Sequence, residues 1–168
     1  IEGLADFIDG VMAQQIASHE VAGATVSVVH DNTLLLSAGY GYADIDAEQA
    51  VVPETTLFRP GSVSKLFTWT ALMQQVEGGQ VDLDADVNTY IDFEIPPFEG
   101  QPVRVRDLMT HSPGMSDVSG ISVATVDELT PYGTWIGQHI PQRLWAPGTE
   151  IAYSNYGVAL AGYIVERV

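Results

Sequence analysis

The chain has 168 residues, of which 46% are hydrophobic, so it holds enough apolar side chains for one folded domain or a large part of one. Its 22 acidic and 6 basic residues leave a formal charge of −16, which argues against nucleic acid and anionic membranes as partners, because both attract clustered Lys and Arg. The absence of cysteine excludes disulfides, Cys-ligated zinc and thiol catalysis, and no apolar run approaches the ~20 residues of a membrane span.

The N-terminal part predicts one helix and one β-hairpin. Apolar residues recur at helical spacing over residues 3–18, which indicates an amphipathic helix. Residues 25–29 alternate and are rich in β-branched side chains, and after an Asp-Asn turn signal residues 33–36 continue as a second strand. The glycine-containing and polar stretch 39–56 is typical of a loop.

A longer helix is predicted to begin at Pro60-Gly61-Ser62 and to end near Glu77, before a Gly-Gly pair. Its apolar side chains cover more than one stripe of the helix surface. A helix that is apolar on nearly all sides is expected to lie buried in the centre of a domain.

Shorter helical segments are predicted at 103–110, 123–129 and 134–140, and a last helix begins near residue 156. These helices have little sheet to cover, because a single two-stranded hairpin is only marginally stable by itself. Either the fold is mostly helical, or further strands follow Val168. Since the last helix is still in progress where the chain stops, we expect a truncated domain.

The clearest chemical signal is Ser62-Val63-Ser64-Lys65, which places Ser62 and Lys65 one helical turn apart on the same face. A serine hydroxyl becomes a nucleophile when a neighbouring base takes its proton, and a lysine amine whose pKa is lowered by burial can be that base. The helix N-terminus adds a free N–H at Ser62, which can form half of an oxyanion hole. Lys65 is also the only lysine of the chain. On these two residues alone, a solvent-reaching lysine and a capping serine explain the pattern at least as well.

A second element, Tyr153-Ser154-Asn155, follows a Pro-Gly turn and precedes the last helix. A phenol beside an ammonium can have its pKa drawn below ~10 and can then relay protons. If the segment is extended, Tyr153 and Asn155 point the same way, and the amide could bond the lysine or a substrate carbonyl. A buried tyrosine and an asparagine helix cap are the simpler explanation.

Four blocks of the sequence resemble, in order and spacing, motifs of the serine β-lactamase and penicillin-binding-protein superfamily. Residues 58–68, FRPGSVSKLFT, resemble its first motif. Residues 108–115, LMTHSPGM, resemble the LLTHTSGL stretch of its class C-like branch, which also contains esterases and D-amino-acid peptidases. The same branch has a Pro-Gly turn and a Y-x-N motif like 145–148 (WAPG) and 153–157 (YSNYG), and a GYAD sequence like that within 39–44.

This resemblance implies an α/β (α+β) fold of the β-lactamase/transpeptidase type, with an antiparallel sheet flanked by helices and a helical subdomain. It implies a serine hydrolase that forms an acyl-enzyme on an ester, amide or β-lactam carbonyl. Ser62 would be the nucleophile, Lys65 and Tyr153 would share the general acid and base roles, and Asn155 would orient the lysine and the substrate. The substrate would be a small molecule or a peptide, as in an esterase, a β-lactamase or a D-Ala peptidase. No metal or organic cofactor is implied, and we expect an extracytoplasmic location, periplasmic or secreted.

One family feature is absent, because the sequence contains neither Lys-Thr-Gly nor His-x-Gly as a third motif. In the family the third motif lies on a strand of the sheet, and this strand supplies the second N–H donor of the oxyanion hole. The Ser62 N–H is therefore the one oxyanion donor that the resemblance assigns to this chain. We therefore expect one β-lactamase-like domain over residues 1–168, truncated before the third motif and with an incomplete sheet. Residues 1–60 would hold the first helix and the hairpin, and residues 61–168 a helical region with the catalytic motifs.

Two alternatives remain beside the hydrolase. In the first alternative, the chain is a non-catalytic fragment or a penicillin-binding-like scaffold with no turnover of its own. The absence of the third motif favours this alternative. A less favoured alternative is an all-helical interaction domain whose motifs are coincidence, and a structure without a hairpin near residues 24–37 would support it.

Other patterns carry weaker signals. Aspartates alternate at positions 82, 84 and 86 and could attract Ca²⁺, but the Gly and Glu of a calcium loop are missing, so a solvated loop or helix start is expected. Ser116-Asp117-Val118 imitates a Ser-Asp-Asn motif but ends in the wrong residue, which favours Tyr153 to Asn155 as the second motif. His111 lies in a matched block, where a structural hydrogen bond is expected rather than a catalytic role.

Overall fold

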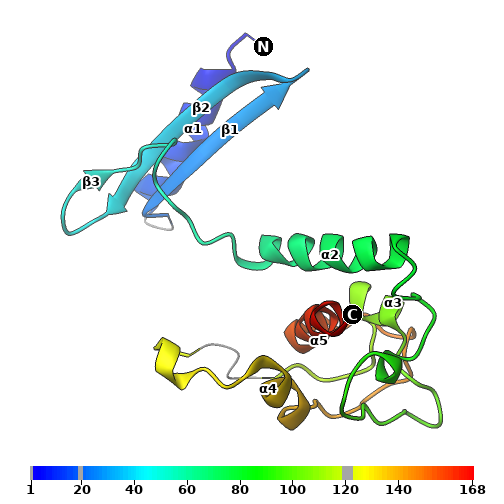
Figure 1. Cartoon of the computed structure of the whole chain (residues 1–168). Helices are drawn as coiled ribbons and strands as arrows, with labels where there is room; N and C mark the ends of the chain where they lie inside the picture. The colour runs from blue at the N-terminus through cyan, green and yellow to red at the C-terminus, as the bar shows by residue number, and fades with distance from the viewer. Residues whose placement is uncertain (1, 19–20, 119–122) are drawn as a thin grey trace. The chain divides into compact units, whose positions relative to one another are not determined.

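The computed structural model describes residues 2–18, 21–118 and 123–168 (Figure 1). The chain forms two compact units, residues 1–59 and 60–168. The first contains a helix and a three-stranded antiparallel sheet, and the second is built from helices. The predicted class, helices with an antiparallel sheet, is confirmed, whereas the single truncated domain stays a prediction. None of the helices in the described part of the chain is long and apolar enough to cross a membrane.

The hairpin of the first unit joins β1 (Gly23–His30) to β2 (Thr33–Asp44). Asp31 and Asn32 form its turn with φ angles of 47° and 58°. Two successive residues with positive φ make the turn type that matches the twist of paired strands, and Asn and Asp tolerate that conformation better than most residues. The predicted hairpin is therefore confirmed, together with the turn residues that predicted it.

The second strand is longer than predicted, so the segment 39–44 is a strand and not a loop. Gly39 lies opposite Thr25 in the register of the hairpin, and the two-residue strand β3 (Gln49–Ala50) pairs with the other edge of β2. A side chain at position 39 would collide with the main-chain carbonyl of Val51. The glycine that suggested a loop thus allows a neighbouring backbone to approach the strand.

The N-terminal helix predicted from apolar spacing is α1 (Leu4–Ala17). None of its residues is fully buried. The Tyr40 hydroxyl on β2 donates a hydrogen bond of 2.7 Å to the Asp9 carboxylate on α1. This polar contact helps to attach the helix to the sheet within the first unit.

The second unit is organised around α5 (Asn155–Arg167), against which α2 (Lys65–Glu77), α3 (Val105–Met109) and α4 (Tyr132–Gln138) pack. The helices meet in one cluster of buried apolar side chains that draws on every one of these elements and on the loops between them. The largest fully buried members are Leu72, Ile95, Leu108, Met115, Ile136, Tyr156, Leu160 and Ile164.

The shorter elements lie close to the predicted segments. The predicted helices 103–110 and 134–140 correspond to α3 and α4, of which α4 begins two residues early. The segment 123–129 forms only a short 3₁₀ helix, η3 (Val126–Glu128). A further 3₁₀ helix, η2 (Val87–Thr89), follows α2 in the chain.

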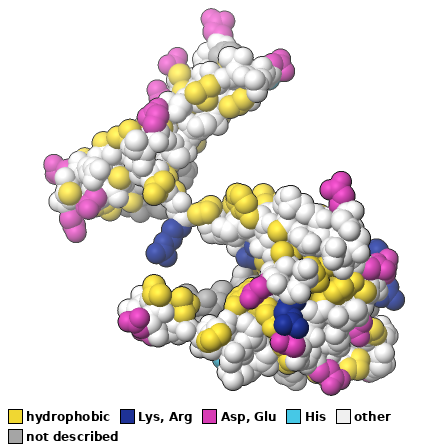
Figure 2. Space-filling model, viewed as in Figure 1, with side chains coloured by type: hydrophobic (Ala, Val, Ile, Leu, Met, Phe, Trp, Pro, Cys, Tyr) yellow, Lys and Arg dark blue, Asp and Glu magenta, His cyan; other side chains and the backbone are white. Residues whose placement is uncertain are grey.

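The long helix begins later and is less buried than predicted. Residues Gly61–Ser64 form a 3₁₀ turn, η1, and the α-helix begins at Lys65. Leu72 is its one fully buried residue, while Leu66 and Phe67 are 62% and 78% exposed and hydrophobic side chains gather at the surface near this end of the helix (Figure 2). Within the second unit, α2 packs on α5 along one side, so the predicted helix surrounded by core is not found in that unit.

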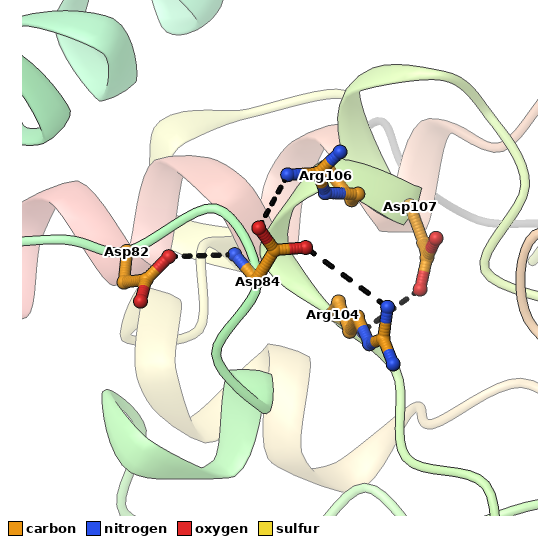
Figure 3. A network of polar contacts seen from close by, with 5 residues as sticks. All are labelled: Asp82, Asp84, Arg104, Arg106 and Asp107. Carbon is orange, nitrogen blue, oxygen red and sulfur yellow. Dashed lines mark hydrogen bonds and ion pairs between the residues drawn. The ribbon is translucent and has the colours of Figure 1, made fainter.

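An acidic turn is attached to the start of α3 by ion pairs (Figure 3). The Asp84 carboxylate accepts a hydrogen bond of 2.6 Å from the Arg106 guanidinium and lies 3.9 Å from that of Arg104. Asp82 accepts from the Asp84 main-chain N–H, and Asp107 accepts from that of Arg104. The aspartates whose spacing suggested a calcium loop thus serve in a turn and in ion pairs, and no group of three or more metal-binding side chains occurs among the described residues.

The loop after α3 runs beside the segment that leads into α5. The Gly114 carbonyl accepts hydrogen bonds of 2.8 and 3.3 Å from the N–H groups of Leu144 and Trp145, and the His111 carbonyl accepts one of 2.8 Å from Ala152. Gly114 has a φ of 72°, and a Cβ there would collide with the Trp145 carbonyl. The glycine therefore permits the close approach of two backbones that places the segment before α5.

We expect Gly114→Ala to destabilise the protein more than Gly79→Ala. Both glycines have left-handed φ angles, 72° and 73°, which cost an alanine about 1 kcal/mol. Nothing lies within 4 Å of a Cβ added at Gly79, whereas one at Gly114 meets backbone. Urea denaturation should give a loss of about 1 kcal/mol for Gly79→Ala and about 3 kcal/mol or more for Gly114→Ala. Equal losses would contradict the close backbone approach.

Candidate active site

The Ser62 hydroxyl is the meeting point of two polar side chains. Lys65 Nζ donates a hydrogen bond of 3.0 Å to Ser62 Oγ, and Tyr153 Oη donates one of 2.6 Å to the same atom. Ser62 lies in η1 and Lys65 is the first residue of α2, so the three-residue spacing leaves both side chains on one side of the helix start. Tyr153 arrives from the segment before α5. The structure thus brings together three residues that the two sequence motifs indicated.

Asn155 is the fourth member of the cluster and the first residue of α5. Its Oδ1 accepts a hydrogen bond of 2.8 Å from Lys65 Nζ, and the same Nζ lies 4.8 Å from the centre of the Tyr153 ring. Ser154 between them is extended, with φ −130° and ψ 117°, so the side chains of Tyr153 and Asn155 fall on the same side. Lys65 therefore contacts two oxygen acceptors and one aromatic face.

Asp117 belongs to the same cluster, although the Ser-Asp-Val pattern around it matches no motif. Its carboxylate accepts a hydrogen bond of 3.0 Å from Asn155 Nδ2, and two more from the main-chain N–H groups of Asn155 (3.0 Å) and Tyr156 (3.3 Å). Sequence reasoning missed this role, since no spacing rule connects position 117 with position 155. The one available signal was its place two residues after the matched block 108–115.

His111 supports Tyr153 from the side. The two rings stack with centroids 4.5 Å apart and planes inclined by 28°, and His111 Nδ1 accepts a hydrogen bond of 3.2 Å from the Ser154 N–H. The structural hydrogen bond expected of this histidine is therefore present. Burial, and then the charge of Lys65, lower the pKa of His111 below its ordinary value, so the imidazole against the phenol ring is neutral at physiological pH.

The pKa of the Tyr153 phenol is lowered below its ordinary value. The main cause is the Lys65 ammonium, followed by the hydrogen bond to Ser62, while the Asp117 carboxylate acts in the opposite direction. Solvent moderates these effects, because Tyr153 is 52% exposed. A phenol that ionises more readily can accept the Ser62 proton along the existing 2.6 Å contact.

A cavity of about 520 Å³ lies beside this cluster within the second unit, and Lys65 and Asn155 form part of its wall. Burial raises the pKa of Tyr132, another residue of the wall, to about 12, so its hydroxyl stays protonated and donates a hydrogen bond of 2.6 Å to the Ala159 carbonyl. The remaining wall is mainly apolar and includes Leu129, Trp135 and Val158. A hydrophobic group could therefore occupy the space next to Lys65 and Asn155.

Residues 8–168 match the protein-family model described as Beta-lactamase. The chain belongs to the beta-lactamase family. The resemblance carried by the four sequence blocks is thereby confirmed. Over 153 residues the chain is 31% identical to the D-aminopeptidase of Brucella canis, a match that covers 86% of this chain and 28% of that protein.

Solved structures agree with this membership of the beta-lactamase family. The octameric penicillin-binding protein homologue from Pyrococcus abyssi matches with a TM-score of 0.83 and 28% identity, over 98% of this chain and 39% of that one. The D-amino acid amidase from Ochrobactrum anthropi SV3 matches with a TM-score of 0.72 and 26% identity, over 96% of this chain and 44% of that one. The fold is therefore that of serine hydrolases of the β-lactamase and D-aminopeptidase type.

The match covers only part of each relative. The chain spans 33% and 28% of the length of two curated relatives, and less than half of the two solved structures. Within this beta-lactamase-family segment, the described structure contains the whole Ser62, Lys65, Tyr153 and Asn155 cluster.

The lowered pKa of Tyr153 can be measured without any substrate. The ultraviolet titration curve of the Tyr153→Phe variant is subtracted from that of the unaltered protein. The difference should show the ionisation of one phenol, with a midpoint below the ordinary pKa of ~10. Lys65→Met removes the main cause of the shift, so in that background the midpoint should rise towards ~10. A difference titration with its midpoint at ~10 or above in the unaltered protein would contradict the geometry around Tyr153.

Proposed function

We propose that this chain carries the nucleophilic centre of a serine hydrolase, which forms an acyl-enzyme at Ser62 on an ester, amide or β-lactam carbonyl. The observation that carries the proposal is the pair of hydrogen bonds that Ser62 Oγ receives from Lys65 and Tyr153. A nucleophile in contact with two groups that can exchange protons meets the requirement for acyl transfer.

The proposed chemistry begins with Tyr153 in its ionised form, which the neighbouring Lys65 ammonium favours. The phenolate takes the Ser62 proton while Oγ forms a bond to the carbonyl carbon, and the carbonyl electron pair moves to the oxygen. The oxygen pair then returns, the bond to the leaving group breaks, and Tyr153 transfers its proton to the departing alcohol or amine. Water repeats the sequence in place of Ser62, which releases the acid and restores the free hydroxyl.

Asn155 and the Ser62 N–H complete the proposed site. Asn155 holds Lys65 through the 2.8 Å bond and would orient the substrate. The Ser62 N–H lies in the first turn of η1, where N–H groups precede any intrahelical acceptor and can bind the developing oxyanion. An oxyanion hole normally uses a second donor, and the loss of one donor typically costs ~10²–10³ in rate. We therefore expect acylation of this chain to be slower than that of a complete site.

The substrate class is inferred from the cavity and the relatives. The mainly apolar wall of the cavity favours a substrate whose acyl group has a hydrophobic side chain. The names of two relatives, a D-aminopeptidase and a D-amino acid amidase, suggest amides of D-amino acids. An activated ester is the least demanding test substrate, because its leaving group needs no proton, and a chromogenic cephalosporin and a D-Ala-D-Ala peptide complete the panel.

Covalent labelling tests the proposal directly. A fluorophosphonate probe, followed by peptide mass mapping, should modify Ser62 and no other serine. Ser62→Ala should abolish labelling, whereas Ser64→Ala, a matched change in the same 3₁₀ turn, should retain it. Labelling at another residue, or undiminished labelling of Ser62→Ala, would reject Ser62 as the nucleophile.

A second candidate is a penicillin-binding-like scaffold that is acylated without turnover, which the absence of Lys-Thr-Gly and His-x-Gly from the sequence favours. The same ester distinguishes the two functions. A hydrolase releases many equivalents of product per protein, whereas a scaffold releases one equivalent and keeps the acyl group on Ser62.

A further inference from the structure

The side-chain amide of Asn155 has two ends, and each end faces a different charged group. Its Oδ1 accepts from Lys65 Nζ at 2.8 Å, and its Nδ2 donates to the Asp117 carboxylate at 3.0 Å. An ammonium group can only donate and a carboxylate can only accept. Reversal of the amide would place Nδ2 against Nζ and Oδ1 against the carboxylate, so both contacts would become repulsive.

The Asp117 carboxylate is itself held in place by the start of α5. It accepts hydrogen bonds of 3.0 and 3.3 Å from the main-chain N–H groups of Asn155 and Tyr156. These two groups lie in the first turn of α5, where no intrahelical acceptor is available and negative charge is favoured. One carboxylate thus binds the helix start and the side-chain amide at the same time.

We infer that Asp117 is a positioning residue for the proposed acyl transfer, which fixes the orientation of the Asn155 amide so that Oδ1 holds the Lys65 ammonium beside Ser62. The inference rests on the proposed function, since it assigns a role within acylation of Ser62. Asp117 acts through Asn155 and Lys65, and it donates no group to the reaction.

The negative charge of Asp117 also influences the phenol. The charged and titratable groups around Tyr153 are Lys65 from α2, His111 from the loop after α3, and Asp117. Lys65 lowers the pKa of Tyr153, and Asp117 raises it. Lys65 is the stronger influence, so if the loss of Asp117 lets the ammonium move away, the pKa of Tyr153 should rise towards its ordinary value, although the opposing charge of Asp117 is also gone.

Asp117→Asn separates the two roles of the carboxylate, because an amide offers one acceptor oxygen instead of two. If that oxygen keeps the N–H groups of α5, its NH₂ faces the Nδ2 of Asn155, and Lys65 loses the Oδ1 contact. The matched control is Ser154→Ala. Ser154 is fully buried and its Oγ accepts a hydrogen bond of 2.9 Å from the Gly157 N–H, so this variant removes a cap of α5 without changing the Asn155 amide.

The test measures the rate constant of Ser62 acylation by an activated ester as a function of pH, together with urea denaturation. Asp117→Asn should lower the plateau rate about 10- to 100-fold, as small misplacements of catalytic groups do, and should move the acidic limb of the profile to higher pH, because Lys65 no longer favours the ionised phenol. Ser154→Ala should lower the denaturation midpoint and leave the limb where it is. A normal acylation rate in Asp117→Asn would overturn the inference. So would an equal loss of rate in Asp117→Asn and Ser154→Ala with no movement of the acidic limb of the pH profile, because Asp117 would then act only as a helix cap.

A second readout separates this inference from the proposed function. In the unaltered protein, NMR should show slow solvent exchange for one Asn155 side-chain amide proton, and Asp117→Asn should accelerate it. If the ester never acylates Ser62 but the exchange behaves as expected, the proposed function fails while the amide orientation stands. If exchange is fast in the unaltered protein, Asp117 does not hold the amide and the inference fails, whatever the rate of acylation.

Discussion

The Lys65 ammonium is the group on which the rest of the site depends. A half-buried cation needs oxygen partners, and the structure supplies Ser62 Oγ and Asn155 Oδ1, with the Tyr153 ring as a third contact. These partners come from the start of α2 and from the segment that enters α5, which are 90 residues apart in the chain. One charge thus brings two distant motifs onto one hydroxyl and favours the ionised form of the phenol.

The backbone makes this convergence possible. α2 and α5 pack against each other in the core of the second unit, which sets the distance between the two motifs. The loop after α3 then guides the chain into α5 through main-chain hydrogen bonds at His111 and Gly114, and the left-handed Gly114 permits the necessary close approach. Asp117, three residues further along the same loop, reaches the first turn of α5. Packing, loop pairing and helix capping therefore act on the same four side chains.

The parts that could be predicted from the sequence are those with a local signal. The three-residue spacing of Ser62 and Lys65, the Asp31-Asn32 turn and the end of α2 at Glu77 follow from neighbouring residues. Asp117 could not be predicted, because its contact with Asn155 depends on how two loops pair. Within the second unit α2 is less buried than its sequence predicts, since an apolar surface shows what a helix is able to bury and not what packs beside it.

Because the chain has only one lysine, the central claim can be tested by NMR with isotope-labelled lysine, which gives a single Nζ signal. We expect this signal to shift over the pH range in which Tyr153 ionises, and this inflection to disappear in Tyr153→Phe. A signal with the same pH dependence in the protein and in Tyr153→Phe would show that the ammonium and the phenol do not interact, and would contradict the proposed role of Lys65.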